Sequence, residues 1–260
     1  MVESVITAVL LKVKYMPASR LKFKTFFFAI CLGCLLFAGC DLVEPPTPTV
    51  VPTVTPPSDM LSLTASKYTY TLVENVEVPG TGIIFRSRDE NNIYIDLDGQ
   101  PSVRRFGDSL IGSKILVPGV LGNYNLRLVD ATFANPYIFG PVTVTIFNPA
   151  PVEMVGINGE PAGAKIVYDG INIDYRIPTG RGLPGSTVTY LGNNDVIANL
   201  GGSAQFRTLP EGNSFVWTGR LNAYSVIQYD LRAVRVTSEE LQMVGTAKIY
   251  LYDQPLLAGG

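Results

Sequence analysis

The sequence of 260 residues contains no histidine. This absence excludes Ser-His-Asp and Cys-His nucleophile systems, most zinc sites, and the side chain that most often transfers protons near neutral pH. A glycine-rich stretch at 179–186 precedes an expected strand rather than a helix, so it lacks the helix N-terminus that binds phosphate. We therefore expect no enzyme, no cofactor and no metal centre.

Cysteine is scarce and is confined to the first 40 residues, at Cys31, Cys34 and Cys40. The rest of the chain can form no disulfide, so any exported domain in it depends on its apolar core alone. Residues 1–39 also hold five of the 20 basic residues but only one of the 22 acidic residues. The remainder is therefore acidic, which disfavours nucleic acid and anionic lipid surfaces as partners.

An apolar run at 26–37 follows three basic residues, Arg20, Lys22 and Lys24. This order is typical of a secretory signal, and the run is shorter than the roughly 20 residues that a membrane-spanning helix needs. It ends in Leu-Phe-Ala-Gly-Cys at 36–40, which resembles the lipobox of bacterial lipoproteins. The resemblance implies that residues 1–39 are a signal peptide, that cleavage leaves Cys40 as the N-terminus, and that its sulfur carries the lipid.

Three alternatives remain open for this segment. Cys34 is a second candidate for lipidation, and the apolar run is alternatively an uncleaved signal anchor. Residues 1–15 add a second apolar patch ahead of a complete signal, so Met16 is a candidate for the true start. If Cys40 is lipidated, its acyl chains contribute about 0.8 kcal/mol per buried methylene and anchor the protein stably. We then expect an exported protein on the extracytoplasmic face of a bacterial membrane or envelope.

Residues 40–59 form the expected tether. The tract at 42–58 alternates proline, threonine and valine with almost no charge. Proline lacks a backbone donor and fixes φ, so the tract favours an extended polyproline II conformation. At about 3.1 Å per residue it would reach roughly 50 Å from the membrane.

The chain beyond the tether shows short β-branched and aromatic runs between turn residues, which predicts strands. The runs in the first half lie at 68–73, 82–86, 92–97, 102–106 and 114–117. Asp98-Gly99 and Asn193-Asn194 are predicted to be tight hairpin turns. Trp217, the only tryptophan, is expected in the core.

An internal repeat organises this part of the chain. Residues 124–149 align without a gap onto 229–254 at an offset of 105 positions. Identical residues include Tyr124 and Tyr229, and Gly140 and Gly245. Each copy is predicted to end in a strand, a loop of about eight residues and a final strand, and a boundary is expected near 148–152, where two prolines lie.

The Tyr-x-Leu that begins each penultimate strand is similar to the tyrosine corner of immunoglobulin-like sandwiches, in which the phenol bonds to upstream backbone. The chain thereby resembles tandem bacterial immunoglobulin-like domains. The resemblance implies an all-β fold with one β-sandwich at 60–149 and a second at 150–260. Arg127 and Arg232 lie on the outward phase of their strands, where we expect a cross-strand carboxylate partner.

Two clusters are candidate binding sites. Asp96 and Asp98 are weak calcium candidates, because calcium binds several hard oxygen ligands, and a solvated hairpin tip is the favoured alternative. Phe133, Tyr137 and Phe139 lie in the predicted last loop of the first module and are candidates for a surface that binds a protein or a glycan. Alternatively these aromatics cover a module interface or the end of the core.

These patterns together predict a membrane-anchored, non-catalytic binding or adhesion module. The first alternative is a structural component of a cell-surface layer or filament. The second is a carbohydrate-active accessory protein or a hydrolase, for which Asp89, Asp96 and Asp98 would have to converge in a cleft. Alternation, turn residues and motifs do not identify the ligand or the oligomeric state.

Overall fold

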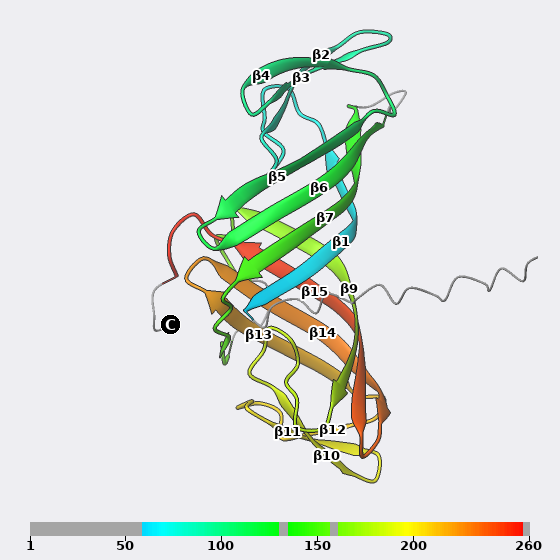
Figure 1. Ribbon diagram of the computed structural model, residues 1–260, viewed down its shortest axis with the longest axis vertical. Helices are drawn as coiled ribbons and strands as arrows, with labels where there is room; N and C mark the ends of the chain where they lie inside the picture. The colour runs from blue at the N-terminus through cyan, green and yellow to red at the C-terminus, as the bar shows by residue number, and fades with distance from the viewer. Residues whose placement is uncertain (1–58, 130–134, 157–160, 257–260) are drawn as a thin grey trace, which may run out of the picture. The chain divides into compact units, whose positions relative to one another are not determined.

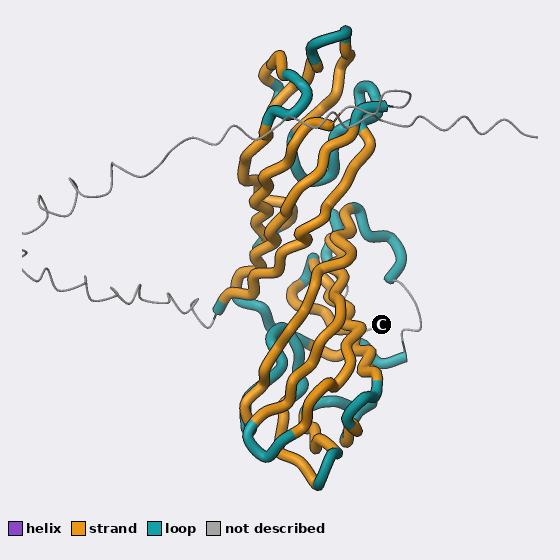
Figure 2. Tube along the Cα trace, turned by 90° about the vertical axis from the view of Figure 1, so that its right-hand side faces the viewer, coloured by secondary structure: helices purple, strands orange, loops and turns teal. Residues whose placement is uncertain are grey.

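The computed structural model describes residues 59–129, 135–156 and 161–256. Within these ranges the chain is all-β and contains no helix, as Figure 2 shows. The predicted all-β sandwich-type fold is confirmed. No helix in the described ranges is long and apolar enough to cross a membrane.

Two antiparallel sheets form in the first half of the described chain (Figure 1). The larger has the order β1 (Met60–Thr71), β7 (Tyr137–Phe147), β6 (Val120–Val129) and β5 (Ser109–Val117). The smaller has the order β2 (Ile83–Arg88), β3 (Ile93–Leu97) and β4 (Gln100–Arg104). Buried and exposed residues alternate along β6, as a strand with one face on a core requires.

The second half repeats this arrangement and adds one short strand. Its larger sheet has the order β8 (Val152–Glu153), β13 (Ser214–Asn222), β14 (Ser225–Val236), β15 (Glu240–Leu251) and β9 (Ile166–Pro178). Its smaller sheet has the order β10 (Thr189–Asn194), β11 (Ile197–Gly201) and β12 (Thr208–Pro210). β8 pairs with β13 and has no counterpart in the described part of the first half.

The internal repeat extends far beyond the aligned segment. Equivalent cross-strand pairs occur in both halves, 105 residues apart in the sequence. Ser109 lies opposite Arg127 in the first half, and Ser214 lies opposite Arg232 in the second. Pairs in the smaller sheets obey the same offset: Ile93 faces Arg104, and Ala198 faces Leu209. We call residues 61–147 the first repeat and residues 166–252 the second repeat.

The main core is an apolar cluster that includes residues of both repeats, and Val226, Tyr250 and Tyr252 form a second, smaller cluster. Trp217, predicted to be buried, is 1% exposed in this core. The chain contacts group Thr55–Gly260 into one compact unit. The division into separate domains at 149 and 150 therefore stays a prediction, although no described sheet contains strands from both sides of that boundary.

Turn chemistry was predicted correctly at one hairpin and wrongly at another. Asp98 and Gly99 have φ of 49° and 81°, as a tight turn between β3 and β4 requires. In the second repeat the left-handed residue is Asp195, with φ of 57°, whereas Asn193 and Asn194 belong to β10. The turn is displaced because β10 continues its pairing with β11 through Asn194.

The predicted eight-residue loops before the final strands are too long in the second repeat. β15 already begins at Glu240, after only three residues beyond β14. Leu241 and Met243 are buried while Gln242 between them is not, so this stretch has the alternation of a strand. In the first repeat Tyr137 and Phe139 likewise belong to β7 and not to a loop.

Candidate functional site

A tyrosine hydroxyl ties the central strand to an upstream turn in both repeats. Tyr124 donates to the Thr81 carbonyl at 2.9 Å, and Tyr229 donates to the Pro184 carbonyl at 2.6 Å. The predicted bond from phenol to backbone is confirmed, but its acceptor lies 43 or 45 residues upstream. In a tyrosine corner it lies only a few residues upstream. Burial raises the pKa of Tyr229 well above its ordinary value.

The turns whose carbonyl groups accept these hydrogen bonds have similar sequences, Val-Pro-Gly-Thr at 78–81 and Leu-Pro-Gly-Ser at 183–186. Proline at the second position and a left-handed glycine at the third, with φ of 75° and 68°, match a type II turn. The last side chain closes each turn, since the hydroxyls of Thr81 and Ser186 donate to the carbonyls of Val78 and Leu183. These turns place Tyr124 and Tyr229 in equivalent positions.

The two repeats differ sharply around these tyrosines. Trp217 of the second repeat occupies the position of Gly112 in the first, and the buried Leu209 occupies the position of Arg104. The Trp217 ring packs beside Tyr229, with ring centroids 6.2 Å apart. In the first repeat Tyr124 lies over Gly112, where an added Cβ would be 2.4 Å from the phenolic oxygen. The first repeat thus lacks the large apolar side chains that fill the second.

A groove of about 440 Å³ lies beside this position in the first repeat. This is within the size range of small-molecule and side-chain binding sites. Its lining is shared by the end of β3, the end of β4, the start of β5 and one residue of β6. The lining residues are Leu97, Asp98, Arg104, Ser109, Leu110, Ile111, Gly112, Ser113 and Tyr124. We call this the β4–β5 groove.

Arg104 is the chemically distinctive residue of the groove. Its Nε is buried and has no hydrogen-bond partner among the described residues. A buried guanidinium nitrogen without a partner costs free energy, and a carboxylate or phosphate group satisfies it with charge-assisted bonds. In the second repeat Leu209 avoids this cost. The β4–β5 groove is therefore suited to an anionic group presented on an otherwise partly apolar ligand.

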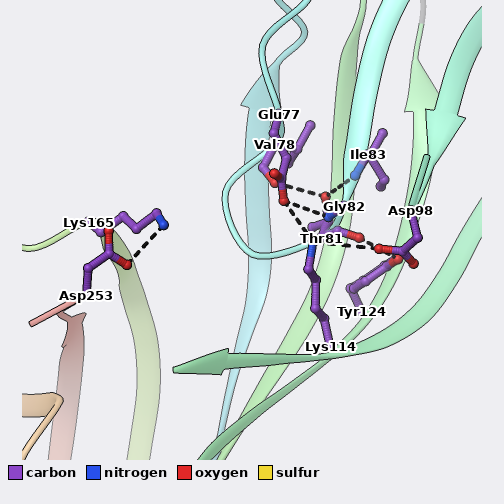
Figure 3. A network of polar contacts seen from close by, with 10 residues as sticks. All are labelled: Glu77, Val78, Thr81, Gly82, Ile83, Asp98, Lys114, Tyr124, Lys165 and Asp253. Carbon is purple, nitrogen blue, oxygen red and sulfur yellow. Dashed lines mark hydrogen bonds and ion pairs between the residues drawn. The ribbon is translucent and has the colours of Figure 1, made fainter. Parts of the chain in front are cut away.

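Asp98, which also lines the groove, belongs to a polar network with Lys114 and Glu77 that is drawn in Figure 3. Lys114 Nζ lies 3.0 Å from Glu77 Oε1 and 3.6 Å from Asp98 Oδ1. Burial alone would raise the pKa of Glu77, but the hydrogen bond and charge of Lys114 and the Gly82 amide lower it below its ordinary value. Because Lys114 neutralises Asp98, Arg104 is the charged groove residue that has no ion-pair partner among the described residues.

The calcium candidates face cations. Arg86 binds Asp96 Oδ2 through Nε at 2.8 Å, and Asp98 is paired with Lys114. Asp89 is held within its own turn by Asn91, Asn92 and Tyr94, which lower its pKa to about 2. No group of three acidic, cysteine or histidine side chains suited to a metal ion occurs in the described ranges. The calcium hypothesis stays a prediction, and these ion pairs count against it.

The aromatic candidates do not line the β4–β5 groove. Phe133 lies outside the described residues, as does Cys40. Tyr137 and Phe139 point to the outer face of the larger sheet, since Ile138 between them is fully buried, and Phe139 is 42% exposed. Phe139 lies opposite Arg127 and Thr69. The two aromatics therefore contribute to an exposed sheet face rather than to the core.

The predicted carboxylate partner of the repeated arginines was wrong. Arg127 and Arg232 are exposed, as predicted, but their cross-strand neighbours are Ser109 and Phe139 for the first, and Ser214 and Val244 for the second. Sequence reasoning also missed Arg104 and Gly112. Extending the repeat upstream at the same offset would have aligned them with Leu209 and Trp217.

The described residues form an all-β, sandwich-type fold in which one strand order occurs twice. Comparison with protein-family models, with curated proteins and with solved structures finds no match to this chain.

Proposed function

We propose that this chain is an exported lipoprotein, anchored through Cys40 and the tether at 40–59, whose first repeat binds an acidic partner in the β4–β5 groove. The observation that carries the proposal is the contrast between the repeats. Equivalent positions hold Trp217 and Leu209 in one copy, and Gly112 and Arg104 in the other, and Arg104 Nε is buried without a partner among the described residues. Trp217 Nε1 is likewise buried without a partner, so the contrast lies in the open groove and in the charge of Arg104, which the apolar Leu209 replaces.

The partner we favour is a protein segment with a carboxylate side chain, and the interaction is non-catalytic. A hydrolase would need Asp89, Asp96 and Asp98 in one cleft. Each of these carboxylates instead has its own partners, in the Asp89 turn, at Arg86 and at Lys114. A structural role in a surface layer remains the second candidate.

The groove is tested with the chain from residue 41 onward, which contains no cysteine, on peptide and glycan arrays. Arg104→Leu should weaken binding to acidic peptides at least about tenfold, because a charge-assisted bond contributes about 1.5–3 kcal/mol. Its folding stability should be kept or raised, as Leu209 shows that leucine fits this position. Arg105→Leu, one residue along and exposed, is the matched control and should bind normally. Equal binding by both variants would refute the groove, and selective binding to glycans would change the partner class.

Anchoring is tested separately with radiolabelled palmitate in the producing bacterium. The label should enter the wild-type chain and Cys34→Ser but not Cys40→Ser, because the lipid is expected on the Cys40 sulfur. Label that persists in Cys40→Ser, or that is absent from the wild type, contradicts the proposed anchor.

A further inference from the structure

β5 is an edge strand of its sheet, and among the described residues no strand pairs with any part of its outer edge. An edge strand presents unpaired backbone donors and acceptors, and proteins normally cover or guard it. β1 and β9, at the opposite edges, contact each other, with the rings of Tyr68 and Tyr168 5.7 Å apart. The two-residue strand β8 pairs with Gly219 and Arg220 of β13 and covers that part of its edge. Among the described residues no strand covers β5, the counterpart of β13 in the first repeat.

β5 also lacks the features that usually guard an edge. It has nine residues and no proline, whereas the neighbouring edge strand β4 contains Pro101. Its one charged residue, Lys114, is paired with Glu77 and Asp98. The outward side chains at its centre are Ile111, Ser113 and Ile115, and the two isoleucines are 74% and 73% exposed. This uncharged, apolar edge favours strand addition.

The outward positions at the centre of β5 are symmetric about Ser113, because Ile111 and Ile115 lie on either side of it, whereas the inward positions hold Gly112 and Lys114. In an antiparallel pair of identical strands, a two-fold axis through one residue places residues equally far on either side opposite each other. With the axis at Ser113, each Ile111 faces Ile115 of the second copy, and both serines meet at the centre. The outward side chains then form two apolar cross-strand pairs with no charge opposite a like charge.

We propose that β5 pairs with β5 of a second copy, antiparallel and centred on Ser113, so that one sheet runs through a symmetric dimer. The pairing uses the backbone edge and the outward side chains of β5. It does not depend on lipidation, but Ile111 and Ser113 also line the β4–β5 groove, so the second copy and the acidic partner would share these residues.

A second copy fits this edge better than the chain's own tether. The tract at 42–58 contains six prolines, which lack the N–H groups that a continuous ladder requires. The tract also lacks the pattern of isoleucines that would pair with Ile111 and Ile115. Two identical strands supply the full set of donors, acceptors and apolar partners.

The axis is tested by a single introduced thiol in the cysteine-free chain from residue 41 onward. Directly opposed residues in antiparallel strands have Cα atoms about 4.5–5.5 Å apart, within the range of a disulfide. Ser113→Cys should therefore form a disulfide-linked dimer under mild oxidation. Ile111→Cys, equally exposed and two residues away, should link far less, because it faces Ile115 and not itself. The double variant Ile111→Cys with Ile115→Cys should link again.

The register is tested by introducing charged side chains at Ile111 and Ile115. Light scattering then measures the molecular mass of each variant. The wild-type mass should be about twice that of the monomer. Ile111→Lys with Ile115→Lys places lysine opposite lysine and should give a monomer. Ile111→Lys with Ile115→Glu places opposite charges together and should restore the dimer. This restoration separates pairing at β5 from a general loss of exposed apolar surface, and thermal unfolding of all three proteins checks that they fold.

A wild-type chain that stays monomeric up to millimolar concentration overturns the proposal. So does a dimer whose mass is unaffected by the double lysine variant, or equal cross-linking of Ser113→Cys and Ile111→Cys. If hydrogen exchange at β5 is protected in a monomer containing the tract at 42–58, and not in one lacking it, the tether is the occupant and the dimer is refuted. None of these results depends on palmitate labelling or on the peptide arrays.

Discussion

At the scale of single residues, the hydroxyls of Tyr124 and Tyr229 link segments of the fold that are far apart in the sequence. Each satisfies a backbone carbonyl of a Pro-Gly turn more than 40 positions upstream in the chain. Thr81, the acceptor in the first repeat, is 2% exposed. Burial of Thr81 leaves no water to replace the phenol, so the Tyr124 hydroxyl fixes the turn against the larger sheet. Pro184, the acceptor in the second repeat, is exposed.

Removal of either hydroxyl should therefore destabilise the protein. We expect Tyr124→Phe to lower the free energy of unfolding by about 1–3 kcal/mol, because the carbonyl of the buried Thr81 is left unpaired. Tyr229→Phe should lower it by only about 0.5–1.5 kcal/mol, because Pro184 is exposed and water can replace the phenol. Urea unfolding of the chain from residue 41 onward measures this loss. The control is Tyr94→Phe, whose exposed hydroxyl donates to Asp89 and should change the stability by less than about 0.5 kcal/mol. A loss at Tyr124 no larger than at Tyr94 would contradict the assigned role.

At the scale of elements, the final strands β7 and β15 each carry a glycine, Gly140 and Gly245, at equivalent positions where the neighbouring backbone leaves no room for a side chain. Gly245 of β15 lies opposite Leu231 of β14 and Ile173 of β9. A Cβ there would lie 2.2 Å from the Asp230 carbonyl oxygen, and one at Gly140 would lie 2.2 Å from the Asn125 carbonyl oxygen. Because that neighbour is backbone, the strand itself would have to move.

Gly245→Ala should consequently lower the free energy of unfolding by about 1–3 kcal/mol, the usual cost of overpacking. Gly182→Ala is the matched control, because its Cβ would meet its nearest neighbour, the Val188 carbonyl oxygen, at 3.5 Å. The control should change the stability by no more than about 0.5 kcal/mol. Thermal and urea unfolding compare the two, and equal stabilities would show that β15 shifts freely.

At the scale of the whole molecule, several tyrosines are buried in the core or beside it. Burial raises the pKa of Tyr168 to about 12 and raises the pKa of Tyr68, Tyr175 and Tyr229 above the ordinary value. A raised pKa means that the folded chain holds its phenolic protons more tightly than the unfolded chain. The resulting stability is fully present below about pH 10 and is lost as the pH rises through the folded values.

The protein should accordingly lose stability in alkali. Each such tyrosine lowers the free energy of unfolding by up to about 1.4 kcal/mol per pH unit above pH 10. Urea unfolding between pH 8 and pH 12 gives the slope, and Tyr168→Phe should reduce it because one linked proton is removed. A stability that does not fall between pH 10 and pH 12 would contradict the burial of these phenols.

Local patterns predicted the strands, the buried Trp217, the Asp98-Gly99 turn and the spacing of the repeat, because alternation and turn conformation are properties of neighbouring residues. They misplaced the second hairpin turn and the final loops, where pairing with an adjacent strand extended β10 and β15. The resemblance to lipoproteins, centred on Cys40, is a reading of the sequence alone, since that residue lies outside the described ranges.

The β4–β5 groove and the exposed edge of β5 were decided only by the tertiary structure. Arg104 and Gly112 look unremarkable along the chain, and they gain meaning because strand pairing sets them in the places that Leu209 and Trp217 fill in the other copy. The edge of β5 is exposed because the strand order puts β5 last in its sheet. Which residues oppose one another, and which strand is left without a neighbour, depends on contacts between distant segments, and no local pattern encodes these.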